Sequence, residues 1–200
     1  MSRRPSRSAI VSLILDSLPP VQRLALAYAP RRAREAWLGL LALDTRPARL
    51  AEPPEQRPQG EPLLALLGRT GAALSPLVDG WEALLGEAPL PQASIAAFAE
   101  GRAQALAGLG GILGLVGEEP AILRVGRDWA LADLALRLSH PGERDHAVAL
   151  IGEGAPLRLP REMRPLTVLH GLALRDLRRG DAAGGIRGAL AAVRLGIFGR

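Results

Sequence analysis

Carboxylates are the side chains with which this chain could do metal chemistry, and their spacing does not favour it. Asp or Glu at positions i and i+4 project from one face of a helix and can together hold a hard cation such as Mg²⁺. No two carboxylates stand four residues apart, and the only pair three residues apart in an expected helix is Asp79 and Glu82. That pair stands alone, so the sequence predicts no metal site.

Several other catalytic side chains are missing altogether. The chain contains no cysteine and no lysine, and the 25 residues counted as Lys or Arg are all arginine. These absences exclude a phosphate-loop lysine, a Schiff-base lysine, a thiol nucleophile, a disulfide and a thiolate metal site. Neither a G-x-S-x-G elbow nor an H-E-x-x-H motif occurs, so no catalytic residue is assigned from a motif.

The three histidines and one acidic pair have plain structural interpretations. His140 and His146 lie near Asp145, but a metal site needs more ligands at tighter spacing, so we interpret this group as a solvated helix start. His170 is expected to be a partly buried helical residue with satisfied hydrogen bonds rather than a catalytic base. The pair at positions 79 and 82 is expected in the first turn of a helix, where the macrodipole favours acids.

The elements that must position these residues are helices. The chain has 200 residues, of which 48% are hydrophobic and 3% aromatic, so one domain with a core of Leu, Ala, Val and Ile is expected. Residues that favour strands are sparse. Apolar residues recur at helical spacing, and the longest such pattern covers residues 92–115. We predict an all-α fold, a single helical domain over residues 1–200.

Prolines and glycines divide this pattern. Residues 1–8 are predicted to be a flexible basic tail, and residues 51–60 (AEPPEQRPQG) a proline-rich loop. Ser75 followed by Pro76 predicts the start of a helix. The five glycines between 108 and 117 have the spacing G-x-G-G-x-x-G with no strand before them, so we interpret them as close-packing positions in a helix rather than as a dinucleotide-binding loop.

The net charge of +5 would suit an anionic partner. The arginines are interleaved with acids and stacking aromatics are scarce, so we do not predict nucleic-acid binding. The longest uncharged apolar stretch, residues 103–117, is too short to span a bilayer. Because Asp16 interrupts the N-terminal apolar run, we expect no export and a cytoplasmic protein.

Peripheral contact with a membrane remains an alternative location. The last expected helix has one apolar face and arginines elsewhere, which suits an anionic membrane surface as well as a protein core. The residues of that face are Ile186, Leu190, Val193 and Ile197.

Three parts of the chain carry a family likeness. They are residues 77–110 (LVDGWEALLGEAPLPQASIAAFAEGRAQALAGLG), 125–138 (VGRDWALADLALRL) with 159–166 (LPREMRPL), and 28–50 (YAPRRAREAWLGLLALDTRPARL). In that order they resemble the middle helices, a later helix with the Leu-Pro segment beyond it, and the first helix pair of the squalene/phytoene synthase family. The resemblance implies the all-α prenyl-synthase bundle.

The resemblance also implies a chemistry from which this sequence departs. Active members of the family join two prenyl diphosphates head to head, and two acidic motifs hold the Mg²⁺. The first motif would lie at 43–50, where Asp44 is followed by Thr-Arg-Pro-Ala-Arg without a second acid. The second would lie at 133–137, where Asp133 is followed by Leu-Ala-Leu-Arg. Asp128 is five residues from Asp133, about 140° around a helix, and cannot share a metal face with it.

We therefore expect a divergent squalene/phytoene synthase-like protein that is non-catalytic, needs no cofactor, and binds a prenyl lipid or a protein partner. Some relatives of that family act as assembly factors for respiratory complexes. The alternative is an active prenyltransferase that condenses prenyl diphosphates in isoprenoid or carotenoid biosynthesis with Mg²⁺. A third interpretation is a helical interaction module whose likeness is compositional. The acids that the alternative would use are Asp44, Asp79, Glu82, Asp128 and Asp133.

Overall fold

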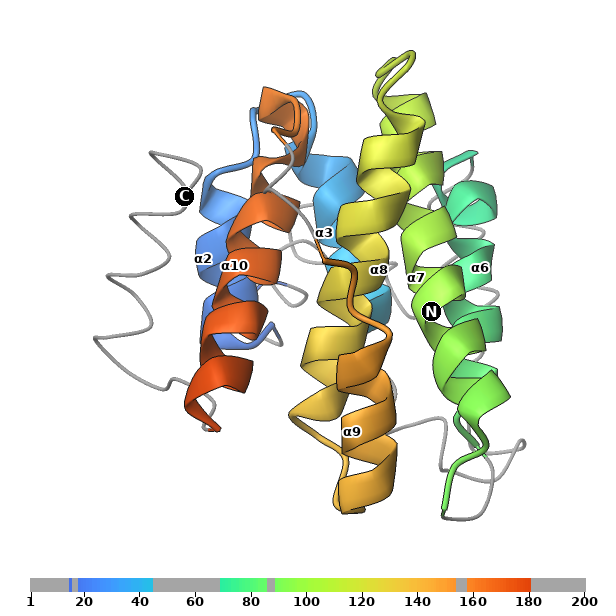
Figure 1. Ribbon diagram of the computed structural model, residues 1–200. Coiled ribbons are helices and arrows are strands. Elements are labelled where there is room, and N and C mark those ends of the chain that lie inside the picture. The colour runs from blue at the N-terminus through green and yellow to red at the C-terminus, as the bar shows by residue number, and fades with distance from the viewer. Residues whose placement is uncertain (1–14, 16–17, 45–68, 86–88, 154–157, 181–200) are drawn as a thin grey trace, which may run out of the picture.

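The computed structural model describes residue 15 and residues 18–44, 69–85, 89–153 and 158–180, and over these ranges the chain is an all-helical bundle (Figure 1). The α-helices are α2 (Pro20–Ala27), α3 (Arg34–Asp44), α6 (Arg69–Glu82), α7 (Gln92–Ile112), α8 (Glu119–Ala135), α9 (Pro141–Ala149) and α10 (Arg164–Arg179), and the 3-10 turn η1 (Arg161–Met163) precedes α10. The predicted tail at 1–8, the loop at 51–60 and the last helix with its apolar face lie outside the described residues.

An antiparallel pair, α7 and α8, forms the centre of the bundle (Figure 1). α6 packs along α7, α10 packs along α8, and α3 contacts both α6 and α7. α7 is buried over most of its surface because its run of alanine and glycine lets neighbours approach from several sides. Every helix in the described ranges is too short or too polar to cross a bilayer.

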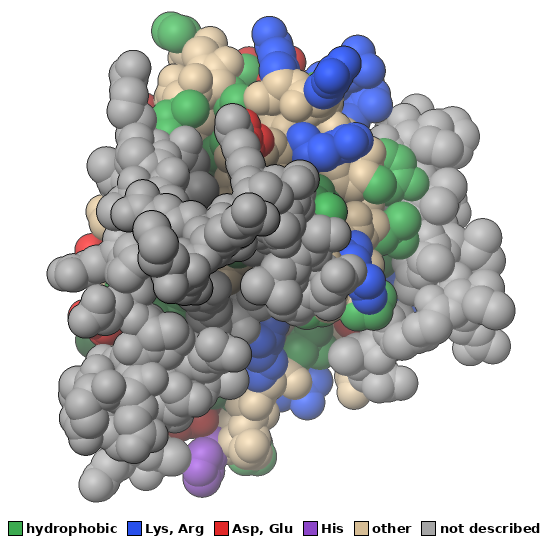
Figure 2. Space-filling view, turned by 180° about the vertical axis from the view of Figure 1, so that it is seen from behind, with side chains coloured by type: hydrophobic (Ala, Val, Ile, Leu, Met, Phe, Trp, Pro, Cys, Tyr) green, Lys and Arg blue, Asp and Glu red, His purple; other side chains and the backbone are tan. Residues whose placement is uncertain are grey.

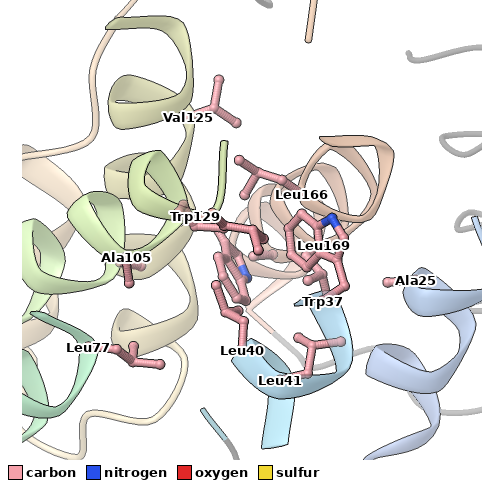
Figure 3. Packing of buried hydrophobic residues seen from close by; sticks show 14 of the residues in the cluster. Ala25, Trp37, Leu40, Leu41, Leu77, Ala105, Val125, Trp129, Leu166 and Leu169 are labelled. Carbon is pink, nitrogen blue, oxygen red and sulfur yellow. The ribbon is translucent and has the colours of Figure 1, made fainter. Parts of the chain in front are cut away.

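The core between α3, α8 and α10 is built around two tryptophans (Figure 3). Trp37 and Trp129 are buried with Leu40 and Leu166 against them. Burial of each such side chain stabilises the fold by roughly 1.5–3 kcal/mol. The indole Nε1 of Trp37 donates to the backbone oxygen of Glu162 at 2.8 Å, which fixes α3 to the turn before α10.

The predicted helix start at Ser75 and Pro76 is wrong, because α6 runs through both residues. An interior proline removes one backbone hydrogen bond and strains the preceding turn, at about 3 kcal/mol. Leu74, Leu77 and Trp81 form a continuous buried face of α6. Their packing against α7 outweighs the local cost of the proline.

The glycines between 108 and 117 serve two different purposes. Gly108 and Gly110 are close-packing positions, as predicted: a Cβ would lie 2.8 Å from the oxygen of Ala73 at the first and 2.7 Å from Cδ1 of Ile122 at the second. The interpretation is wrong for Gly111, where a Cβ would meet no atom within 4 Å. It is also wrong for Gly114 and Gly117, because α7 ends at Ile112 and both lie in the turn before α8 with φ of 74° and 83°. Such positive φ values favour glycine.

Candidate functional site

A completely buried arginine lies at the centre of the bundle. Arg102, on α7, has 0% of its surface exposed. Phe98 lies four residues earlier and is also buried, so ring and guanidinium project from the same face of α7. A buried charge requires partners, since an unpaired ion in a protein interior costs several kcal/mol.

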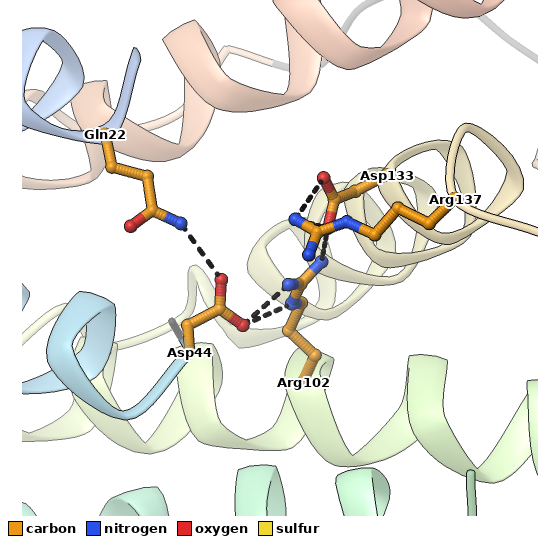
Figure 4. Close-up of polar contacts among 5 residues, drawn as sticks. All are labelled: Gln22, Asp44, Arg102, Asp133 and Arg137. Carbon is orange, nitrogen blue, oxygen red and sulfur yellow. Dashed lines mark hydrogen bonds and ion pairs between the residues drawn. The ribbon is translucent and has the colours of Figure 1, made fainter. Parts of the chain in front are cut away.

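Two carboxylates from different helices pair with this guanidinium (Figure 4). Asp44, the last residue of α3, accepts hydrogen bonds on Oδ1 from Nε of Arg102 at 3.0 Å and from NH2 at 2.6 Å. Asp133, on α8, accepts from NH1 at 3.1 Å on its Oδ2. The arginine therefore joins three helices through three of its nitrogens.

Two further residues complete the polar cluster. Arg137, four residues after Asp133, donates from NH2 to Oδ1 of that aspartate at 3.0 Å. Gln22, from α2, lies 3.4 Å through its Nε2 from Oδ2 of Asp44. The cluster therefore combines two arginines with two aspartates, and its formal charges cancel.

Three aromatic rings surround the guanidinium. Its Cζ lies 4.1 Å from the ring centroid of Trp129, 5.0 Å from that of Phe98 and 5.9 Å from that of Trp81. The rings of Trp81 and Phe98 meet edge to face, with centroids 4.7 Å apart. A cation over desolvated aromatic faces gains about 2 kcal/mol, so the rings offset part of the cost of burying the charge.

The aromatic side of this cage depends on close contact between α6 and α7. Gly80 and Gly101 face each other there, immediately before Trp81 and Arg102 in the sequence. A Cβ on Gly101 would lie 2.2 Å from the backbone oxygen of Pro76. Only glycine at position 101 permits the helix separation that places the indole of Trp81 near the guanidinium.

Burial and the arginines act in opposite directions on the two carboxyl groups. Burial raises the pKa of Asp44 even though Arg102 opposes it. Burial also acts upward on the pKa of Asp133, but the charges of Arg102 and Arg137 together outweigh it, and that pKa is lowered. Burial acts downward on the pKa of Arg102, yet its two aspartates hold that pKa above the ordinary value.

The cluster can orient helices, but its carboxylate oxygens already accept hydrogen bonds from arginine and glutamine. Mg²⁺ needs free oxygen ligands in octahedral geometry and keeps several waters. In the described part of the chain, no three His, Asp or Glu side chains gather in a way that could hold a metal ion.

The structure separates the other three predicted acids from this cluster. Asp79 and Glu82 are exposed and lie in the last turn of α6, not in the first turn of a helix as predicted, because α6 begins at Arg69. Asp128 is buried and accepts a hydrogen bond at 2.9 Å from the backbone N–H of Gly152. Of the five candidate acids, the structure thus brings only Asp44 and Asp133 together.

Sequence reasoning missed Arg102 and Gln22. A signal for the arginine existed: it shares a helical face with Phe98, Leu106 and Leu109, all of them apolar and fully buried. A lone cation on an apolar face predicts a buried ion pair. Gln22 had no such signal, because a glutamine at the start of a short helix is ordinary at the surface.

Of the two histidines near α9, His140 lies at the solvated helix start as predicted, whereas the prediction is wrong for His146, which is half-buried in the last turn of α9. His140 is exposed and precedes the first residue of α9. Asp145 is also exposed. His170 differs from expectation: its Nε2 is buried and has no hydrogen-bond partner among the described residues, so the predicted satisfied histidine is wrong at that atom.

His170 is expected to make stability depend on pH. Burial lowers its pKa from 6.5, and Arg124 nearby lowers it further, while Asp128 acts in the opposite direction. His170 therefore binds a proton more readily in the unfolded chain than in the folded protein. The stability that is present above pH 6.5 is lost as the pH falls below 6.5. We expect His170→Gln to reduce this loss, by at most about 1.4 kcal/mol per pH unit. Urea unfolding at pH 7.5 and 5.5 measures the free energy of unfolding of the original protein and of the variant. If both lose the same amount between the two pH values, this prediction is contradicted.

A comparison of the sequence with models of known protein families found no match, and neither did searches of curated proteins and of solved structures.

Proposed function

We propose that this chain is a divergent, non-catalytic squalene/phytoene synthase-like protein that acts by binding either a prenyl lipid or a protein partner. One observation carries the proposal. The guanidinium of Arg102 lies between Asp44 and Asp133, the two acids that the family resemblance assigns to the two metal-binding motifs.

The charge between these two acids is supplied by the chain itself. Arginine stays protonated in proteins, so Arg102 is a permanent cation at this position. A Mg²⁺ ion would have to displace a guanidinium that two carboxylates and three rings hold. That exchange would leave a second positive charge buried without partners, which is strongly unfavourable.

The filled interior favours a protein partner over a prenyl chain. Side chains of Trp37, Trp81 and Trp129 occupy the space between α3, α6, α7 and α8, together with Phe98 and Arg102. The surface offers more room: a groove of about 530 Å³ between α9 and α10 combines apolar and charged side chains. These are Leu138, Pro141, Val148 and Leu177 with Arg144, Asp145 and Arg178.

The active-enzyme alternative has one observation in its favour, which is the convergence of Asp44 and Asp133 from separate helices. Titration calorimetry with farnesyl and geranylgeranyl diphosphate, with and without Mg²⁺, tests both functions when the mixtures are also assayed for condensed product. We expect no Mg²⁺-dependent binding and no product. Binding of farnesol without Mg²⁺ would support the prenyl-lipid form of the proposal.

A matched variant makes the test sharper. Asp79→Asn with Glu82→Gln removes the exposed acidic pair of α6, and we expect it to bind as the unmodified protein does. Condensed product that requires Mg²⁺ and disappears in this variant or in Asp133→Asn would overturn the proposal in favour of the enzyme.

A further inference from the structure

An apolar turn protrudes at one end of the bundle. Residues 111–117 (GILGLVG), here called the apolar tip, comprise the last two residues of α7 and most of the turn before α8. They carry no charged side chain, and Glu118 and Glu119 follow them directly. Val116 is 96% exposed and Ile112 is 42% exposed. The tip extends beyond the ends of the neighbouring helices (Figure 1). Nothing in the packing of the described helices requires valine at a position that touches almost no other residue.

Arginines gather at the same end of the molecule. Arg32 is ion-paired with Glu162, so the turn before α3 lies beside η1. Figure 2 shows basic side chains gathered at the upper end of the molecule, where the turn between α7 and α8 and the start of α10 also lie in Figure 1. The basic end, as defined here, consists of the exposed residues Arg31, Arg32, Arg34, Arg161 and Arg164.

The arginines at the start of α10 lie where folding alone does not favour them. The N-terminus of a helix carries partial positive charge and prefers acids. α3, α8 and α9 follow that preference and have an acid in the first turn, whereas α2, α6, α7 and α10 have none. α10 begins at Arg164, and Arg161 and Glu162 precede it in η1. An anionic partner would neutralise both the side chains and the helix terminus.

We propose that this end of the bundle docks on a membrane surface of anionic phospholipids, with the apolar tip among the acyl chains and the basic end among the phosphates. Guanidinium groups bind phosphate through two parallel hydrogen bonds. A bilayer presents an anionic layer directly above an apolar one, and this end of the bundle carries both exposed arginines and an exposed valine. An acidic protein would match the arginines but leave Val116 without a complement.

This inference is independent of the proposed function, because it concerns where the protein binds and not whether it is catalytic. Vesicle flotation tests it with phosphatidylcholine alone and with 30% phosphatidylserine added. We expect binding only to the anionic vesicles, and its loss in 0.5 M salt, where surface charges are screened.

Matched double variants locate the surface. Arg31→Ala with Arg164→Ala is expected to weaken binding to anionic vesicles about thirty-fold, since each arginine near such a surface contributes a factor of about five. Arg23→Ala with Arg179→Ala makes the same change in net charge, on α2 and at the other end of α10, and should leave binding within about two-fold of the original. Equal losses in both variants would overturn the proposal.

The apolar tip can be followed with a fluorescent label, because the chain contains no cysteine. Val116→Cys labelled with an environment-sensitive dye should shift its emission to the blue on anionic vesicles, and quenchers in the acyl chains should reduce it. Leu85→Cys, just after α6, is the matched exposed position and should show neither change. A label at 116 that stays in water, or vesicle binding that ignores lipid charge, would overturn the proposal. Binding to an acidic protein without binding to vesicles would also overturn it.

Discussion

Replacing Arg102 with methionine is expected to lower the free energy of unfolding by about 3–5 kcal/mol. The change leaves Asp44 buried without its main partner and removes the cation that the three rings surround. Removing one partner of a buried ion pair is costly because the remaining charge is buried away from water and has no opposite charge to replace its hydration. Urea unfolding followed by circular dichroism measures the loss.

A combined variant separates charge from packing. Arg102→Met together with Asp44→Asn and Asp133→Asn removes the charges of the guanidinium and of its two carboxylate partners while keeping similar volumes, and we expect most of the stability to return. Arg127→Met is the matched control, because Arg127 forms an exposed ion pair with Glu100 and should cost less than about 1 kcal/mol. If Arg102→Met lowers the free energy of unfolding by no more than this control does, the buried cluster does not stabilise the bundle as we describe.

Gly101→Ala is expected to destabilise the protein by about 3 kcal/mol, the upper end of the range for overpacked interiors. The added Cβ would lie 2.2 Å from the backbone oxygen of Pro76 and 2.9 Å from Cα of Gly80. Neither backbone atom can move away as a flexible side chain would, so α6 and α7 must separate. Thermal unfolding measures the loss, and near-ultraviolet circular dichroism should report the altered packing of Trp81.

Gly111→Ala is the matched control for that substitution. Gly111 lies in the same helix, and a Cβ there would meet no atom within 4 Å. Because alanine is the better helix former, we expect Gly111→Ala to be neutral or to stabilise by up to about 1 kcal/mol. A loss of stability at Gly101 and a gain at Gly111, in the same helix, would show that contact with α6, and not helix propensity, decides the effect of the substitution. Losses of similar size at both positions would contradict this.

Both substitutions act on the same feature, the junction of α6, α7 and α8 around the guanidinium. The close approach at Gly101 positions Trp81, and Trp81 together with Trp129 covers the cation. We therefore expect Gly101→Ala and Arg102→Met to be non-additive, as is usual for neighbours that share partners.

Much of the architecture could be predicted from periodicity. The helix expected at 92–115 is present as α7 at Gln92–Ile112, and the all-α fold is confirmed. Local rules failed at Ser75 and Pro76, because proline favours a helix start only when packing does not require the helix to continue. The same tertiary packing explains why Gly108 supports a helix contact while Gly114 shapes a turn.

The candidate site was only half predictable. Spacing and the family resemblance singled out Asp44 and Asp133, which lie 89 positions apart in the chain. Nothing in their local sequence says that one guanidinium joins them. That pairing arises because α3 and α8 both pack against α7, and Asp44 and Asp133 then meet different nitrogens of the Arg102 guanidinium.

By itself, the sequence determined the helical class, the approximate boundaries of α7, and the absence of lysine and cysteine chemistry, because these depend on composition and on contacts within one turn. Only the tertiary structure decided which charges are buried, which acids meet, and which end of the bundle carries both the arginines and Val116. Such outcomes depend on contacts between residues distant in the chain, and helical periodicity carries no information about them.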